Sequence, residues 1–169
     1  MELVKFTEDS FKSLVLNIDS PWEMMVWAGA KYTYPLTFQQ LVDRMNQKLN
    51  GKTKNHLFSL FDSAITGAIG YIEIEIIDEN KKLGSIKSVM IFKNFRGLKY
   101  SNTLLNLACS YSFETLKLKA LELKVFSFNN AAISCYKKAG FIEKEILNSV
   151  DPGTGKSFQL IVMRKENDL

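Results

Sequence analysis

One segment constrains the fold more than any other: an apolar strand, a helix and a second strand follow one another between Leu83 and Phe126. Apolar and β-branched residues concentrate in Leu83–Phe92, and Leu121–Phe126 alternates between apolar and charged side chains. Between them, Ser101–Lys117 carries apolar residues at helical spacing. A helix that joins two strands of one sheet makes them parallel through a right-handed crossover, so the sequence predicts an α/β sheet.

The rest of the chain predicts further strands and helices around this unit. The expected elements are a strand at Leu3–Phe6, helices at Thr7–Leu16 and Phe38–Leu49, strands at Leu57–Asp62 and Gly67–Ile77, a helix at Asn129–Lys138, and a closing hairpin of Phe141–Val150 and Phe158–Arg164. The three strands before the crossover are expected to be antiparallel. The prediction is a mixed α/β sheet with helices on both faces.

Composition restricts the class of protein. With 169 residues, 46% of them hydrophobic, the chain is expected to form a single domain over residues 1–169. No run of about 18 apolar residues occurs, so we expect no membrane span, and the first residues predict no signal peptide. Cys109 and Cys135 lack metal-ligand spacing, which predicts no metal site and a cytoplasmic location. The net charge of +4 comes from scattered lysines, so no nucleic-acid partner is expected.

The segment Phe92–Asn102 joins the first strand of the crossover to its helix. The first backbone N–H groups of a helix are unpaired, and the positive end of its dipole points toward this turn. Arg96 and Lys99 add positive charge, so the turn suits an anion such as a pyrophosphate. Many helices begin after an Arg-Gly turn without a ligand, and these residues alone leave both possibilities open.

A second informative segment, Leu123–Phe141, lies about 30 residues further on. Here a strand ends, Asn129 is in position to cap a helix, Tyr136 follows at helical spacing, and Gly140-Phe141 closes the helix. Together the two segments resemble the GNAT superfamily of N-acyltransferases, and within it the Rim-type N-acetyltransferases of ribosomal proteins. The family pattern R-G-x-G-x-G/A aligns with residues 96–101, where Arg96 and Gly97 match it, and N-x-x-A-x-x-x-Y-x-x-x-G-F matches fully at residues 129–141.

This resemblance implies a fold and a cofactor. The expected fold is a GNAT-like mixed, mostly antiparallel seven-stranded sheet with helices on both faces and a splayed parallel strand pair. The expected acyl donor is acetyl-CoA, with its pantetheine arm against the backbone of Met90 and Ile91. The other cofactor-binding residues implied are Arg96, Gly97, Leu98, Lys99, Tyr100, Ser101, Asn102 and Asn129. The sequence departs from the family where Lys99 replaces Gly, Ser101 replaces Gly or Ala, and Lys93 replaces Pro.

The resemblance also implies a catalytic set. Tyr136 is expected to protonate the leaving thiolate, although a tyrosine on a helix face can also serve packing alone. Asn129 is the second residue of this catalytic set, and it is also expected to cap the helix that carries Tyr136. The base stays open: Glu73 and Glu75 alternate on one side of a strand, and ordered water is the other candidate. His56, which has no visible partner in the sequence, is not expected to act.

The acceptor stays open as well. The predicted activity is acetyl transfer to a primary amine, either a protein N-terminus or a small amine; the alternative is a coenzyme A-binding module with little turnover. The segment between Asp19 and Thr37 resembles the substrate-side helices of Rim-type members. Its aromatic residues either line an acceptor pocket or cover the core: Trp22, Trp27, Tyr32 and Tyr34. The edge of the last hairpin makes a homodimer possible.

One motif is a false lead. Gly153–Ser157 ends like a nucleotide-binding P-loop, but Val150 stands where the motif needs its first Gly. The residues after it, Phe158–Met163, also form a strand pattern instead of a helix. We therefore interpret the segment as a hairpin turn.

Overall fold

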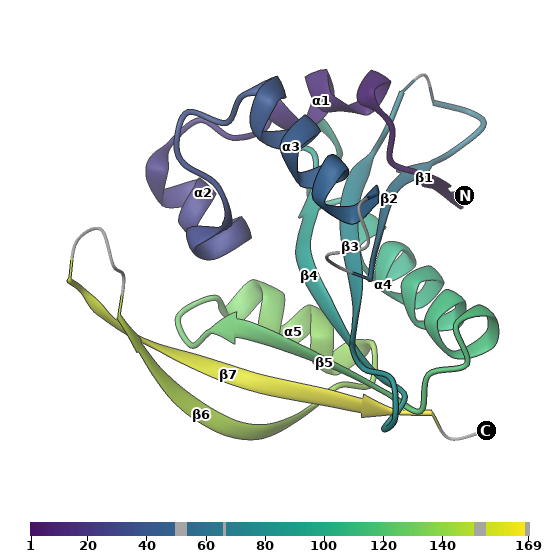
Figure 1. Cartoon of the computed structure of the whole chain (residues 1–169), viewed down its shortest axis with the longest axis vertical. Helices are drawn as coiled ribbons and strands as arrows, with labels where there is room; N and C mark the ends of the chain where they lie inside the picture. Colours follow the sequence, from purple (N-terminus) through teal and green to yellow (C-terminus); the bar gives the residue numbers. More distant parts are fainter. Residues whose placement is uncertain (50–53, 66, 151–154, 168–169) are drawn as a thin grey trace.

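The structure is a computed structural model that describes residues 1–49, 54–65, 67–150 and 155–167 (Figure 1). Its seven strands form one sheet in the order β1-β2-β3-β4-β5-β7-β6. The strands are β1 (Glu2–Lys5), β2 (Asn55–Phe61), β3 (Gly70–Asp78), β4 (Leu83–Ile91), β5 (Ala120–Phe126), β6 (Ile142–Val150) and β7 (Ser157–Glu166). Only β4 and β5 pair in parallel; every other pair is antiparallel. The predicted mixed sheet is therefore confirmed.

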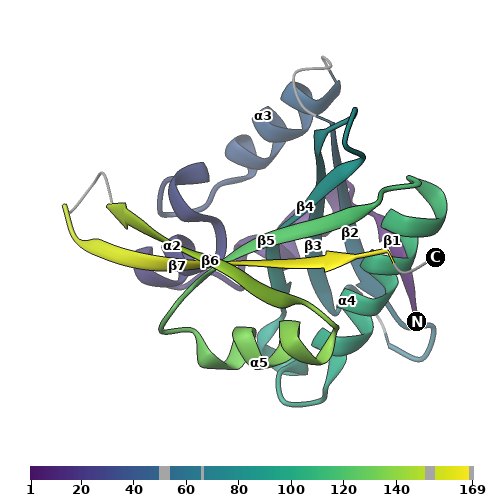
Figure 2. The same ribbon diagram turned by 90° about the horizontal axis from the view of Figure 1, so that it is seen from below.

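Helices cover both faces of this sheet (Figures 1 and 2). They are α1 (Phe11–Val15), α2 (Pro21–Ala28), α3 (Phe38–Leu49), α4 (Tyr100–Ser110) and α5 (Asn130–Lys138), with 3₁₀ turns η1 (Glu8–Ser10), η2 (Gly29–Lys31) and η3 (Lys93–Phe95) and a π-helical turn η4 (Tyr111–Thr115). One core packs β-strands against α4 and α5, and a second packs the opposite face against α1, α2 and α3. Two cores on one sheet explain why central strands are buried on both faces.

The alternation of β3 divides its side chains between the two cores. Ile72 and Ile74 are fully buried on the α4 side, while Tyr71 is fully buried on the other side. Burying each isoleucine side chain stabilises the fold by roughly 1.5–3 kcal/mol. Glu73 shares the Tyr71 face and is also fully buried, so that face needs a partner for a carboxylate.

The element order predicted from the residues did not include α2. This helix begins with Ser20 as its N-cap, whose Oγ accepts a hydrogen bond from the N–H of Glu23 at 3.1 Å, and with Pro21 in its first turn. Both are ordinary start signals of a helix. Apart from these start signals, only the resemblance to substrate-side helices indicates a helix here.

Helix α3 also begins at a capping residue: Thr37 accepts a hydrogen bond through its Oγ1 from the N–H of Gln40 at 3.3 Å. Asn50-Gly51, a pair that favours the end of a helix, lies outside the described residues, as do Gly153 and Thr154 of the predicted hairpin turn. Ser157 begins β7, so a strand and not a helix follows the P-loop-like sequence.

Candidate active site

The two parallel strands separate after a short contact. β4 and β5 pair at only three positions, from Leu83 with Ala120 to Ser85 with Glu122, and then diverge (Figure 1). The N–H of Phe92 donates a hydrogen bond to the carbonyl of Ile69, on the β3 side of the chain. Because successive residues of a strand direct their backbone groups to opposite sides, those of Ile91 point toward the gap. The expected splay is thus present, with an unpaired strand edge beside it.

The backbone groups of Met90 and Ile91 point to opposite sides of β4. The carbonyl oxygen of Met90 lies against Gly70 of β3, where an added Cβ would approach it to 2.5 Å. Ile91 faces the splay, and its carbonyl accepts a hydrogen bond from Nε of Arg96 at 3.1 Å. The same alternation adds Val89, which sequence reasoning missed, as the next residue whose backbone faces the gap.

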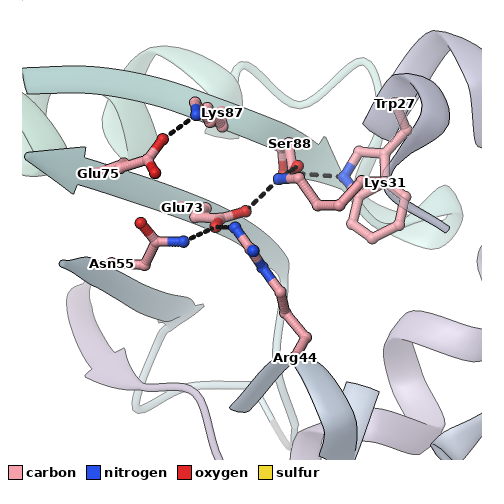
Figure 3. A network of polar contacts seen from close by, with 8 residues as sticks. All are labelled: Trp27, Lys31, Arg44, Asn55, Glu73, Glu75, Lys87 and Ser88. Atoms are coloured by element: carbon pink, nitrogen blue, oxygen red, sulfur yellow. Dashed lines mark hydrogen bonds and ion pairs between the residues drawn. The ribbon is translucent and has the colours of Figure 1, made fainter. Parts of the chain in front are cut away.

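A β-bulge just before these residues bends β4. Glu73 pairs with Lys87 but Tyr71 pairs with Met90, so β4 holds one extra residue, and Ser88 adopts a left-handed φ of 52°. Two side chains hold this bulge: Nε1 of Trp27 donates to the Ser88 carbonyl at 2.8 Å, and Nζ of Lys31 donates to the Ser88 hydroxyl at 2.9 Å (Figure 3). The helix α2 and the turn η2 therefore position the strand edge that faces the splay.

The same lysine belongs to a buried ionic network around Glu73 (Figure 3). The Glu73 carboxylate is 0% exposed and accepts from Lys31 at 2.5 Å, from Arg44 at 2.6 Å and from Nδ2 of Asn55 at 2.6 Å. Burial alone would raise the pKa of Glu73, but the two cations outweigh it and hold that pKa below its ordinary value. Burial lowers the pKa of Lys31.

This network changes the choice of base. Glu73 and Glu75 lie on one face of β3, as predicted, but neither carboxylate is free. Glu73 is bound by two cations, and Glu75 pairs with Lys87. A carboxylate with a lowered pKa that is already hydrogen-bonded is a weak proton acceptor. Of the two candidates that the sequence left open, ordered water is favoured.

The turn before α4 has the features of an anion site. Arg96, Gly97, Leu98 and Lys99 are exposed, and Gly97 has a left-handed φ of 80°. Within the described part of the chain, the N–H groups of Gly97, Leu98 and Lys99 have no hydrogen-bond acceptor. Tyr100 and Ser101 follow as the first turn of α4, whose N–H groups are unpaired by helical geometry.

Both polar groups of Asn102 that the prediction could use are already hydrogen-bonded within the protein. Its N–H bonds the carbonyl of Lys99 at 3.1 Å, and its Oδ1 accepts from Sγ of Cys135 at 3.2 Å. The side chain therefore links α4 to α5 and does not point out of the turn as a free donor.

Lys99 shows why Gly is usual at this place. It is the N-cap of α4 and adopts a left-handed conformation, with φ of 64° and ψ of 10°. A residue with a Cβ is strained by roughly 1–2 kcal/mol in this region, whereas Gly is not. The turn keeps the conformation that a Gly would adopt, although it carries a lysine.

Replacing Lys99 by Gly is expected to raise the free energy of unfolding by up to about 1 kcal/mol, because the strain of the Cβ disappears. Urea unfolding at neutral pH measures the change. Lys99→Ala is the control, since it removes the same ammonium group and keeps the Cβ. Equal stability of the two variants would assign the effect to the charge and contradict the backbone explanation.

Helix α5 carries the two predicted catalytic residues. Oδ1 of Asn129 accepts from the N–H of Ala132 at 3.2 Å, so its side chain caps α5 as expected. Tyr136 is partly buried, and its ring packs on Phe141 with centroids 6.3 Å apart. No hydrogen bond joins its hydroxyl to any described residue. Burial raises the pKa of Tyr136 well above its ordinary value, which keeps the phenol protonated at neutral pH.

A pocket of about 440 Å³ lies beside the splay, between α2–η2, the end of β5 and the β6–β7 hairpin. Tyr32 and Tyr34 line it. Trp27 instead stacks on Tyr32, with ring centroids 5.5 Å apart, and Trp22 stacks on Phe128 at 5.3 Å. The two roles that the sequence left open are therefore divided: the tyrosines line the pocket, and the tryptophans pack behind or beside it.

His56 lies away from this site. Its Nδ1 contacts the hydroxyl of Tyr111 at 3.2 Å, on the sheet face that carries α4. Over the described ranges, no group of three or more His, Cys, Asp or Glu residues could hold a metal ion. No helix in the part of the chain that the structure describes is long and apolar enough to cross a membrane.

These features coincide with a known family. A sequence model of the acetyltransferase (GNAT) family matches residues 20–141, a range that includes α2, the splayed strands, the Arg96 turn and α5. The chain belongs to this family. The predictions of an N-acetyltransferase and of acetyl-CoA as acyl donor are confirmed at the level of the family. The resemblance to its Rim-type members stays a prediction.

Relatives within the family come from Vibrio cholerae. Its spermidine N(1)-acetyltransferase is 26% identical over 123 residues, which are 72% of this chain and 66%, slightly under two thirds, of that protein. The crystal structure of spermidine N-acetyltransferase from Vibrio cholerae with CoA and spermine has a TM-score of 0.82 at 20% identity and covers 97% of this chain and 94% of that chain. A structure of the spermidine/spermine N-acetyltransferase from this organism with manganese ions, also 20% identical, has a TM-score of 0.75 and covers 97% and 91% of the two chains. This likeness confirms the fold.

Proposed function

We propose that this chain transfers the acetyl group of acetyl-CoA to the primary amine of a small molecule, by direct attack in a ternary complex. The observation that carries the proposal is the splayed edge of β4 beside a helix N-terminus with unpaired N–H groups. An extended pantetheine arm can pair with such an edge as an added strand, and a pyrophosphate suits such a turn.

The residues divide the binding between them. The backbone of Gly97 to Ser101 and the charges of Arg96 and Lys99 hold the pyrophosphate. The backbone of Ile91 faces the pantetheine arm, while Met90 supports it from the β3 side. Asn129 and Asn102 act indirectly, since one caps α5 and the other joins α5 to α4. These contacts hold Tyr136 at one place relative to the turn.

The chemistry requires one bond to form and one to break. The amine nitrogen attacks the thioester carbonyl, a nitrogen–carbon bond forms, and the carbon–sulfur bond breaks. A backbone N–H at Val89 or Ile91 polarises the carbonyl oxygen, which can be worth about 3 kcal/mol. Tyr136 donates its proton to the leaving sulfur, and the proton of the amine passes to water.

The kind of acceptor is inferred from the relatives and from the pocket. The relatives are named for spermidine, a small amine, and the pocket has the volume of a small-molecule site. Both favour a small amine over a protein N-terminus. The alternative function, a coenzyme A-binding module without turnover, depended on the replacement of Gly by Lys99. Because Lys99 adopts the left-handed conformation that a Gly would adopt, this replacement gives the alternative little support. The homodimer stays a prediction.

Calorimetric titration with acetyl-CoA tests the cofactor site. We expect saturable binding, and Arg96→Ala should raise Kd about tenfold, which corresponds to about 1.4 kcal/mol, because a charge-assisted contact to phosphate is lost. Lys12→Ala, which removes an exposed cation on α1, is the matched control and should leave Kd unchanged. Absence of binding, or an equal loss in both variants, would contradict the proposed site.

A further inference from the structure

We infer that the acceptor is a primary amine on an uncharged, apolar body such as an aromatic ring, and not a polyamine; this inference rests on the proposed function. The first observation is the position of the pocket. Phe126, at the end of β5, and Tyr32, next to Lys31 of the bulge contact, both line it. A molecule in the pocket therefore lies where an amine can reach the open end of the splay.

The second observation is the chemistry of the walls. Aromatic rings and methionines dominate them, including Met24, Met25, Tyr34 and Phe158, and no charged side chain of the described residues lines the pocket. A polyamine keeps at least one further ammonium group on its body. Burying that group without a carboxylate costs several kcal/mol, whereas an apolar body gains from the same walls.

The third observation concerns the carboxylates near the splay. Glu73 is bound by Lys31 and Arg44, and Glu75 pairs with Lys87. Burial is the main cause that lowers the pKa of Lys87. Lys124 of β5, on the other side of the splay, is a further cation that is close enough to lower it. Four cations thus face two carboxylates, so the local field opposes a polycation.

The acidic residues beside α2 do not change this balance. Asp19 pairs with Lys93, and Oε2 of Glu23 accepts from the N–H of Asp19 at 2.8 Å. Neither residue lines the pocket.

The surroundings of the pocket also suit a flat, apolar body. Phe126, Phe128 and Phe158 pack with ring centroids between 5.1 and 6.1 Å apart, and Trp22 stacks on Phe128. Rings held in this way form a rigid wall and lose little conformational entropy when a ligand binds. An aromatic or branched apolar amine would complete this cluster.

The test compares 2-phenylethylamine with spermidine as acceptors, by the initial rate of coenzyme A release at saturating acetyl-CoA. We expect kcat/KM to be at least about tenfold higher for 2-phenylethylamine. Equal or higher kcat/KM for spermidine would overturn the inference and leave the proposed function intact. Binding of acetyl-CoA without release in the presence of either amine would overturn the proposed function, and this inference with it.

A variant pair tests the walls directly. Met25→Glu places a carboxylate in the pocket and should shift the ratio of the two kcat/KM values toward spermidine by about tenfold. Met25→Gln, of similar size and without charge, is the matched control and should shift the ratio much less. Equal ratios in the two variants would mean that the charge of this pocket does not select the acceptor.

Discussion

Replacing Tyr136 by Phe is expected to lower kcat for acetyl transfer by roughly two to four powers of ten and to leave the Kd of acetyl-CoA unchanged. The ring packs on Phe141, and Phe keeps that contact. Only the hydroxyl is lost, and it makes no hydrogen bond to the described residues. Because burial raises its pKa, the phenol stays protonated and able to donate at neutral pH. Coenzyme A release measures kcat, and calorimetry measures Kd.

Tyr111→Phe is the control for this experiment. Its hydroxyl contacts His56 of β2, which does not border the splay between β4 and β5, so its loss should leave kcat unchanged. The alternative role of Tyr136 is packing, and it predicts a different outcome. A Tyr136→Phe variant with a lower Tm and normal kcat would assign the residue to the core and remove it from the reaction.

Replacing Glu73 by Gln is expected to lower the free energy of unfolding by about 3–5 kcal/mol, the usual cost of leaving a buried charge unpaired. Lys31 and Arg44 are only 18% and 15% exposed and would lose their shared carboxylate. Urea unfolding at pH 7 measures the loss. Glu75→Gln is the control: its pair with Lys87 is more exposed, so a change of at most about 1 kcal/mol is expected.

The same network predicts a pH dependence. The pKa of Glu73 is lower in the folded state than in the unfolded chain, where it is about 4.3. Its contribution to stability is therefore fully present above that value and is lost as pH falls through the folded pKa. The Glu73→Gln variant should lack this part of the acid-induced loss. An unchanged acid transition in the variant would contradict the assignment.

Much of the fold could be predicted because the signals are local. The alternation along β3 placed Glu73 and Glu75 on one face of the strand, and the position of Asn129 alone predicted a helix cap. The sequence also shows that Lys99 stands where the family has Gly, and the structure has a left-handed backbone at this position. Each of these depends on a few consecutive residues and on the period of a strand or a helix.

The site could be predicted only in outline. Motifs located the Arg96 turn and Tyr136, but the bulge at Ser88 has no turn residue that would reveal it. The helix α2 has no clear apolar periodicity, so of the sequence signals only Ser20 and Pro21 and the resemblance to substrate-side helices indicate it. Glu73 and Glu75 were rightly placed on one face, yet their partners come from segments up to 42 positions away in the chain.

By itself the sequence determined most of the element types, the parallel crossover, the family and the turn that suits a pyrophosphate, because these depend on periodicity and short motifs. Only the tertiary structure decided that Glu73 is neutralised by Lys31 and Arg44, that Trp27 and Lys31 hold the Ser88 bulge, and that aromatic and methionine side chains line the pocket beside the splay. These properties arise where segments distant in the chain meet, as η2 and α3 meet β3 at Glu73, and the charge and burial of a side chain there depend on those neighbours.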